Sequence, residues 1–432
     1  MAVPIIRARF CANLTGGRAG CSFSPLASRR GRTLTTQAAA VPAEKADPTG
    51  HGGEPAGSAG PAAGTGNPLP ASFRTAVSDP RKHTAEHVGR YYTVPKAAQN
   101  GLFSIYQLSK KARELHKLSG EFSIMVRQPF IEVRSYLEQY DFTQPALRII
   151  LYGRLGTGKS HTMAHILHYA LMSDWIIIGN HWLPEWVKRP KEIQVNEEDP
   201  LILDNPLDAV IWLQHFRLLN ADLLGRLNLT TSQEWKWSET DVTARGEPLT
   251  NIVEHGIKRA KHACLCVRAL LEEVKAYTNA GKMKTLVAVE GVNIIWEDSY
   301  QRRVDRSYVP SQDFHLIQSF KSILSNDWKN AAVIVTVDEG ALSLKHRNLQ
   351  LENVPSFMPQ YLLGKKGFEF FEPFLPVRLE NYTDKEFESA IDFFIATNFI
   401  QHPKAKTAAA REEFKFLSGN NPRELLKLCS WI

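Results

Sequence analysis

The sequence has little cysteine and no long apolar run. Its 432 residues include five cysteines, none of them in the C-x-x-C spacing of a structural zinc site or redox motif. This argues against a zinc site or a disulfide framework and favours a reducing compartment. No apolar run approaches the roughly 18–20 residues that cross a bilayer, so we expect no contact with a membrane. With 43% hydrophobic and 22% charged residues, the composition is that of an ordinary globular protein of about two or three domains.

Acidic residues are absent from the start of the chain. Residues 1–43 contain six arginines, and the first carboxylate is Glu44. An arginine-rich, acid-free segment with serine and threonine is typical of an organellar transit peptide, which we place at residues 1–40; a disordered basic arm is the alternative. Without these six charges the formal net charge falls from +7 to +1. The excess of positive charge therefore comes mostly from the leader and does not indicate that the whole protein binds nucleic acid.

Two further segments precede the first motif. Residues 41–80 are rich in Gly, Ala, Pro and Ser and have almost nothing to bury, which predicts a disordered linker. Residues 81–140 mix basic and aromatic side chains, such as Arg81, Tyr91 and Lys110. Such an extension can lie along an RNA backbone or a partner protein, although a solvated helix face fits as well. We expect a helix over residues 122–140.

A glycine-rich loop follows a short apolar run. Leu147–Tyr152 predicts a buried parallel strand, residues 153–160 read GRLGTGKS, and residues 161–172 predict a helix. The loop matches G-x-x-x-x-G-K-[ST] at every fixed position and lies in the strand–loop–helix context of a phosphate-binding P-loop. Glycines let the backbone N–H groups point at a phosphate, and the new helix adds the positive end of its dipole. Lys159 would reach the β- and γ-phosphates and Ser160 would bind Mg²⁺. We assign nucleotide contacts to Gly153, Gly156, Thr157, Gly158, Lys159, Ser160 and His161.

Strands alternate with helices after this loop. Apolar runs at 175–179, 285–289 and 331–337 predict strands, and 208–227, 252–277 and 314–324 predict helices. This pattern predicts an α/β fold with a mostly parallel sheet, which we place at residues 141–378. Residues 379–432 are predicted to form a small helical domain, with helices at 383–397 and 406–431 and a turn before Arg423.

Two strand ends compete for the acid that holds magnesium. Glu290 follows the strand at 285–289, and Asp338 with Glu339 follows the strand at 331–337; the strand pattern alone leaves both open. His161, His165 and His168 share one face of the loop helix. That face can hold a metal but can equally be a polar surface or pack against the sheet.

The residues together resemble the death-associated protein 3 family, nucleotide-binding proteins of the mitochondrial ribosomal small subunit. The resemblance rests on sequence segments that occur in one order over most of the chain. They are IILYG ending at Gly153, GTGK ending at Lys159, Asp174-Trp175-Ile176, LVAVE ending at Glu290 with GVN to Asn293, Asn326-Asp327-Trp328, Leu362-Leu363-Gly364-Lys365 with Gly367-Phe368, and Lys385-Glu386-Phe387-Glu388-Ser389.

The resemblance implies a P-loop NTPase fold of the AAA-plus and signalling-NTPase kind, with a C-terminal helical lid. It implies that Glu290, and not Asp338 or Glu339, is the acid of the magnesium site. It also implies that Thr336 is the γ-phosphate sensor and that Arg423 is the lid arginine. It also implies GTP or GDP with Mg²⁺, and contacts with ribosomal RNA and ribosomal proteins in the mitochondrial matrix, near the interface with the large subunit. The family usually has aspartate at the position of Glu290, and the linker at 41–80 is unlike that of animal members.

We therefore expect a structural ribosomal protein whose nucleotide is architectural, with at most slow hydrolysis. An active AAA-plus ATPase of the matrix is the first alternative, but Gly291 stands where a second acid would be needed. A GTPase switch is the second alternative. The chain has no Asn-Lys-x-Asp element to read guanine, so the base cannot be assigned by motif and ATP stays open.

Overall fold

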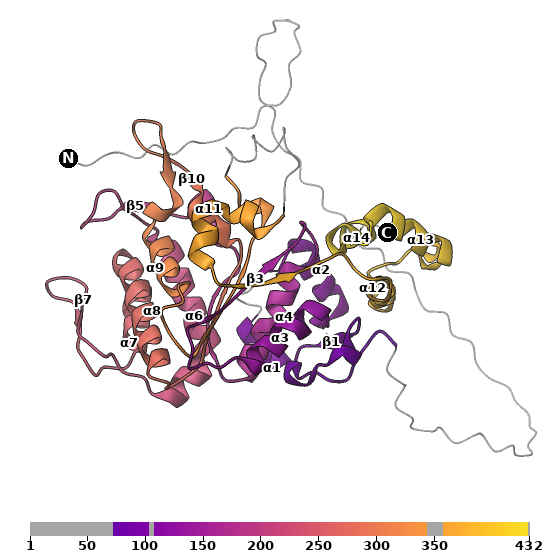
Figure 1. The fold of residues 1–432 in the computed structure, drawn as a ribbon, viewed down its shortest axis with the longest axis horizontal. Helices are drawn as coiled ribbons and strands as arrows, with labels where there is room; N and C mark the ends of the chain where they lie inside the picture. Colours follow the sequence, from indigo (N-terminus) through magenta and orange to yellow (C-terminus); the bar gives the residue numbers. More distant parts are fainter. Residues whose placement is uncertain (1–71, 103–107, 344–356, 431–432) are drawn as a thin grey trace, which may run out of the picture. The chain divides into compact units, whose positions relative to one another are not determined.

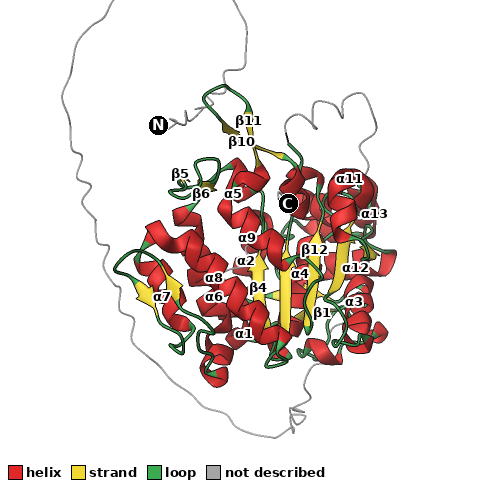
Figure 2. Ribbon diagram, turned by 60° about the vertical axis from the view of Figure 1, so that its left-hand side comes forward, coloured by secondary structure: helices red, strands yellow, loops and turns green. Residues whose placement is uncertain are grey.

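A five-stranded parallel sheet forms the centre of the protein. The computed structural model describes residues 72–102, 108–343 and 357–430, so the predicted leader and most of the predicted linker lie outside the described residues. Figure 2 shows the strands side by side between two layers of helices. In spatial order they are β13 (Leu375–Arg378), β3 (Leu147–Tyr152), β12 (Ala331–Thr336), β9 (Thr285–Val289) and β4 (Ile176–Asn180).

The inner strands are buried on both faces, which explains their unbroken apolar runs. Every residue of β9 and β12 is buried. Ile149 of β3 lies opposite Ile334 of β12, and Val335 of β12 lies opposite Val289 of β9. The predicted strands at 147–152, 175–179, 285–289 and 331–337 are confirmed within one residue. The edge strand β13 was not predicted because it buries only Val377 and contains Pro376, which suits an edge.

One face of the sheet is covered by helices from the first part of the chain. Leu147, Ile149 and Leu151 of β3 pack with α1 (Lys96–Leu102), α3 (Gln128–Gln139) and α4 (Lys159–Met172). The predicted helix at 161–172 is thereby confirmed.

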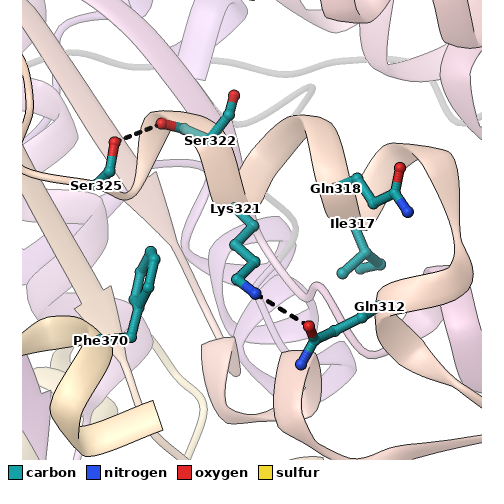
Figure 3. A pocket seen from close by; sticks show the side chains of 7 residues that line it. All are labelled: Gln312, Ile317, Gln318, Lys321, Ser322, Ser325 and Phe370. Atoms are coloured by element: carbon teal, nitrogen blue, oxygen red, sulfur yellow. Dashed lines mark hydrogen bonds between the residues drawn. The ribbon is translucent and has the colours of Figure 1, made fainter. Parts of the chain in front are cut away.

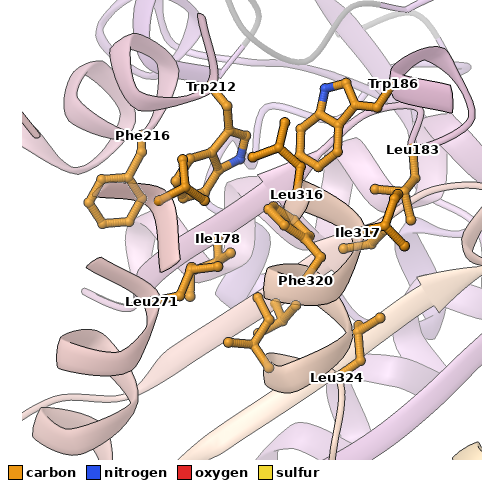
Figure 4. Close-up of a cluster of buried hydrophobic side chains, with 14 of the residues drawn as sticks. Ile178, Leu183, Trp186, Trp212, Phe216, Leu271, Leu316, Ile317, Phe320 and Leu324 are labelled. Atoms are coloured by element: carbon orange, nitrogen blue, oxygen red, sulfur yellow. The ribbon is translucent and has the colours of Figure 1, made fainter. Parts of the chain in front are cut away.

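The other face carries the larger core. Its helices are α5 (Glu185–Lys188), α6 (Pro206–Leu227), α7 (Thr250–Lys258), α8 (Ala263–Asn279), α9 (His315–Ile323) and α11 (Pro359–Phe371). Figure 4 shows Phe320 of α9 between Trp186 and Trp212; the ring centroids lie 4.9 and 5.4 Å away in edge-on arrangements. These aromatic contacts join α5, α6 and α9 over the sheet.

Two predicted helices are wrong in extent. Residues 122–140 contain β2 (Ser123–Met125), paired antiparallel with β1 (Tyr91–Thr93), before α3 begins. The predicted helix at 252–277 is broken into α7, the 3₁₀ turn η3 (Ala260–His262) and α8. The break lets α7 fold back on α8, and Gly256 permits the close approach, since a Cβ there would lie 2.8 Å from Cys266 Cβ.

The C-terminal helices share a core with the N-terminal part of the described chain. They are α12 (Asp384–Ala396), α13 (Ala408–Ser418) and α14 (Pro422–Cys429), grouped beside α2 (Lys110–Ser119) in Figure 1. Tyr91 of β1 stacks on Phe393 of α12 with ring centroids 4.2 Å apart. The same core includes Phe73, Leu115 and Leu425.

The remaining strands form small antiparallel pairs. They are β5 (Gln194–Val195) with β6 (Leu203–Asp204), β7 (Trp235–Lys236) with β8 (Val242–Thr243), and β10 (Asp298–Arg302) with β11 (Tyr308–Pro310). Within the described residues, no helix is both long and apolar enough to cross a membrane.

Candidate functional site

The glycine-rich loop at residues 153–160 lies between β3 and α4, at the carboxyl edge of the sheet. Gly156 and Gly158 have φ of +89° and +99°, which glycine adopts without strain. Gly153 is required for a different reason, because a Cβ there would lie 2.2 Å from the carbonyl oxygen of Leu379. The sequence folds into a tight turn here because glycine occupies all three positions.

Lys159 lies folded into this loop. Its Nζ donates to the carbonyl oxygens of Gly153 at 2.9 Å and Arg154 at 3.1 Å. It also forms a 3.0 Å ion pair with Asp338 Oδ2, and both side chains are largely buried. The ammonium group therefore sits inside the loop and faces an acid from the end of β12.

Ser160 and Glu290 are in direct contact. The Ser160 hydroxyl donates to Glu290 Oε2 at 2.6 Å. Burial, reinforced by the charge of Asp338, raises the pKa of Glu290 well above its usual value. The other carboxyl oxygen, Oε1, is buried without a hydrogen-bond partner in the described part of the chain. An unpartnered oxygen beside a hydroxyl is the kind of donor set that a hard cation such as Mg²⁺ prefers.

Hydrogen bonds between neighbouring strand ends hold the two acids in place. Thr336 Oγ1 accepts from the Gly291 N–H at 3.0 Å. Asn293 bonds the backbone of Asp338 twice, accepting from its N–H at 3.0 Å and donating to its carbonyl at 3.1 Å. The turn after β9 is thus tied to the end of β12, which keeps the backbone segments that carry Glu290 and Asp338 next to each other.

A second set of contacts reaches the loop from the other side. Arg127, just before α3, donates from its guanidinium to the Thr157 carbonyl at 2.6 Å. The same guanidinium pairs with Glu386 of α12 at 3.0 Å, and both side chains are buried. Glu386 also caps its own helix, accepting from the Thr383 N–H at 2.9 Å. Arg127 therefore links the loop to the C-terminal helices.

The start of α14 packs directly on Gly156. Asn421 donates to the Leu155 carbonyl at 3.1 Å, and the Arg423 N–H donates to the Gly156 carbonyl at 3.2 Å. A Cβ on Gly156 would lie 2.5 Å from Asn421 Oδ1 and 2.7 Å from Arg423 Cβ. The Arg423 guanidinium is exposed and makes no hydrogen bond or ion pair within the described residues.

The structure thus brings most of the predicted site residues to one edge of the sheet. Thr157 is buried, with its hydroxyl donating to the Arg154 carbonyl at 2.9 Å. His161 is half-buried, and its pKa is lowered to about 4 by lost solvation and the nearby charge of Arg127. Thr336 lies at the strand end but contacts Gly291 and not Lys159.

The histidine face of α4 is used for packing. His165 Nε2 lies 2.9 Å from Nδ1 of His83, and His168 Nδ1 lies 3.1 Å from the Tyr92 hydroxyl. His165 also stacks on Phe130. Over the described ranges, these residues do not form a group with metal-ligand spacing.

Sequence reasoning missed the contacts that cross the chain. Arg127 and Glu386 are 259 residues apart. Arg127 lies outside the segments that carry the resemblance, and the segment that contains Glu386 gives no sign of its partner. The resemblance implies Glu290 and not Asp338 as the acid at this site, yet Asp338 is the acid that pairs with Lys159. A separate open hollow of about 440 Å³ lies between α9 and α11. Figure 3 shows Lys321 pointing to Gln312 in this hollow. The side chains that line the hollow include no acid and no histidine.

Comparisons with known proteins point to one family. The family model described as "Mitochondrial ribosomal death-associated protein 3" matches residues 124–428. A Mus musculus protein named "Small ribosomal subunit protein mS29" is 34% identical over 83% of this chain and 89% of its own length. The protein of the same name from Bos taurus is 34% identical over 83% of this chain and 88% of its own. That from Neurospora crassa is 24% identical over 47% of this chain and 42% of its own.

Proposed function

The chain belongs to the mitochondrial ribosomal death-associated protein 3 family, and we propose that it is a structural protein of the mitochondrial small ribosomal subunit with an architectural nucleotide. Its relatives are named as small-subunit ribosomal proteins, and this places the chain in the ribosome of the mitochondrial matrix. Its partners are then ribosomal RNA and neighbouring ribosomal proteins, and a contact with the large subunit belongs to the same proposal.

One observation supports the nucleotide: three chemically distinct groups meet at the glycine-rich loop. Lys159 folds back into the loop, Ser160 lies in the first turn of α4, and Glu290 directly follows β9, the strand next to β12. A P-loop NTPase uses such a lysine for the β- and γ-phosphates, with loop N–H groups around them. The proposed fold identity is therefore a P-loop NTPase with α12–α14 as its lid.

Magnesium fits the Ser160–Glu290 pair. A Mg²⁺ ion held there would neutralise negative charge on the phosphates. Ser160 would offer its hydroxyl, and Glu290 its buried, unpartnered Oε1. The glutamate side chain is about 1.5 Å longer than that of aspartate, so we expect Glu290 to contact the ion through a water molecule.

The remaining predicted residues take supporting roles in this proposal. Thr336 and Arg423 would lie near the terminal phosphate, from the sheet and from the lid. Guanine nucleotide is favoured by family resemblance, with ATP as the alternative. Such a ligand stabilises the fold because it binds the native state and adds RT ln(1 + [L]/Kd) to the free energy of unfolding.

The test is the nucleotide content of the protein purified gently from its particle. Denaturation should release close to one guanine nucleotide per chain, and turnover should be far below the usual enzyme range of about 1 s⁻¹ or more. Lys159→Ala should lose the nucleotide and fail to enter the small subunit. Lys321→Ala, which alters a lysine outside the loop, should behave as the natural protein.

Other outcomes would overturn the proposal in distinct ways. Rapid turnover with unchanged assembly of Lys159→Ala would make the chain a working NTPase. Sedimentation as a free hexamer, separate from small subunits, would favour the AAA-plus ATPase. A nucleotide-free native chain that assembles normally would remove the architectural role.

A further inference from the structure

A group of metal-ligand side chains lies well away from the glycine-rich loop, where the β7–β8 hairpin meets α7 and η3. Within the described residues, Asp241, His255 and His262 form the only group of three or more His, Cys, Asp or Glu side chains that lie closely enough to hold one ion. A ligand atom of each lies within 4.8 Å of the other two. The three come from the hairpin turn, from α7 and from η3.

The two imidazoles face one another. His255 Nε2 lies 3.0 Å from His262 Nδ1, and the rings are nearly parallel at 7°. Two nitrogens that each lie 2.0–2.1 Å from one Zn²⁺ ion in tetrahedral geometry are roughly 3.3 Å apart. The present spacing therefore needs a change of a few tenths of an ångström to admit the ion.

The surrounding contacts hold these ligands in position. Trp237 is buried and stacks on His255, with ring centroids 5.3 Å apart and an angle of 20°. The Asp241 carbonyl accepts from the N–H groups of Trp237 at 2.9 Å and Ser238 at 3.2 Å. The Asp241 N–H donates to Ser238 Oγ at 3.0 Å. The turn is thus fixed by its backbone, while the Asp241 carboxylate is left for other partners.

That carboxylate is weakly engaged. The nearest cation in the described chain is Arg259, 4.0 Å away, and the Arg259 side chain is 63% exposed. An exposed pair at this distance contributes little, so a divalent ion can displace the guanidinium into solvent.

We propose that Asp241, His255 and His262 bind one divalent transition-metal ion, Zn²⁺ being the best match, that fastens the β7–β8 hairpin to α7. Two imidazoles and one carboxylate are ligands of borderline softness that suit Zn²⁺ better than Mg²⁺ or Ca²⁺. Three protein ligands leave a fourth position for water or a partner residue. The role is structural, because the ion joins the hairpin to α7, which otherwise meet here through the stacking of Trp237 on His255 and the exposed Asp241–Arg259 pair. This site is independent of the nucleotide proposed above.

The test uses the full chain, stripped of metal with a chelator and titrated with Zn²⁺, with Co²⁺ as a visible probe. One ion should bind per chain and raise the melting temperature. Asp241→Asn, His255→Ala and His262→Ala should each weaken binding by about 100-fold or more, since even outer-shell changes cost 10–100-fold. His402→Ala, which alters a histidine outside this group, should bind as the natural chain does.

A spectroscopic measurement on the natural chain covers the case in which a variant does not fold. X-ray absorption of the Zn²⁺-loaded protein should show two imidazole ligands and one carboxylate. Failure to bind one ion, binding that survives all three substitutions, or a spectrum without imidazole would overturn the proposal. The two histidines would then be a hydrogen-bonded pair only.

Discussion

The glycine-rich loop is held differently on its two flanks. On the strand-end flank, Glu290 and Asp338 contact two side chains of the loop, Ser160 and Lys159. On the helical flank, the contacts come from Arg127, Asn421 and Arg423, and they reach the carbonyl oxygens of Thr157, Leu155 and Gly156.

This difference separates contacts that a ligand can replace from contacts that it leaves in place. A phosphate and its Mg²⁺ ion compete for a lysine, a hydroxyl and a carboxylate, and these are the groups engaged on the strand-end flank. Carbonyl oxygens do not bind phosphate, so the helical flank can keep its bonds when a ligand arrives. Changes on the helical flank should therefore affect stability, and changes on the strand-end flank should affect ligand binding and pH dependence.

The largest expected effect is on the helical flank. Arg127→Ala removes one partner of a buried ion pair and leaves Glu386 buried without its counter-charge. Such losses cost about 3–5 kcal/mol, so we expect that reduction in the free energy of unfolding, measured by urea denaturation of the nucleotide-free protein.

Arg217→Ala is the matched control, because Arg217 pairs with Glu254 at the surface. Exposed pairs contribute about 0–1 kcal/mol. Equal losses in the two variants would mean that Arg127 does not join the loop to the C-terminal helices.

The next effect concerns the contact of α14 with the loop. Gly156→Ala would place a Cβ against Asn421 and Arg423, whereas Gly246, with nearly the same φ of +88°, has no atom within 4 Å of that position. Both substitutions incur the backbone cost of positive φ. Overpacking adds about 1–3 kcal/mol for Gly156→Ala only, and thermal unfolding of the two variants side by side measures that difference. If Gly246→Ala is equally destabilised, α14 does not rest on Gly156.

The same contrast explains what the sequence could predict. The strand-end flank follows from local patterns: β9 and β12 are unbroken apolar runs, and an acid stands at the end of each. Lys159 and Ser160 belong to a contiguous motif. The helical flank depends on the pairing of Arg127 with Glu386, 259 residues away, and no local spacing encodes it.

The errors in the fold have a similar cause. Edge strand β13 buries one residue, so it leaves no apolar run to detect. The residues of α7 and α8 have the pattern of one helix because both segments are helix-forming. The break accompanies the close tertiary approach of Gly256 to Cys266, which a local pattern does not reveal. The proposed metal ligands Asp241, His255 and His262 follow no motif spacing and meet only through this fold-back.

A third test addresses the charge of Glu290 on the strand-end flank. Burial and Asp338 raise its pKa above the ordinary 4.5, so the folded chain keeps a proton that the unfolded chain releases. The free energy of unfolding must then fall as pH rises above about 4.5, by up to about 1.4 kcal/mol per pH unit, until the folded pKa is passed. Glu290→Gln removes this loss, so its stability advantage over the natural nucleotide-free chain should grow with pH in denaturation series. An advantage that is constant with pH would show that Glu290 is ionised throughout.

The smallest expected effect distinguishes the two strand-end acids. Asp338→Asn frees Lys159 from its ion pair and removes a negative charge beside the proposed phosphate position. We expect nucleotide affinity to rise about threefold to tenfold, equivalent to about 1 kcal/mol, as measured by calorimetric titration with GDP and Mg²⁺. Glu339→Gln is the control, because it removes an adjacent half-buried acid that makes no ion pair with Lys159. If Asp338→Asn weakens binding instead, Asp338 helps to hold the magnesium ion, and the strand-end flank has two metal-site acids where the family resemblance implies one.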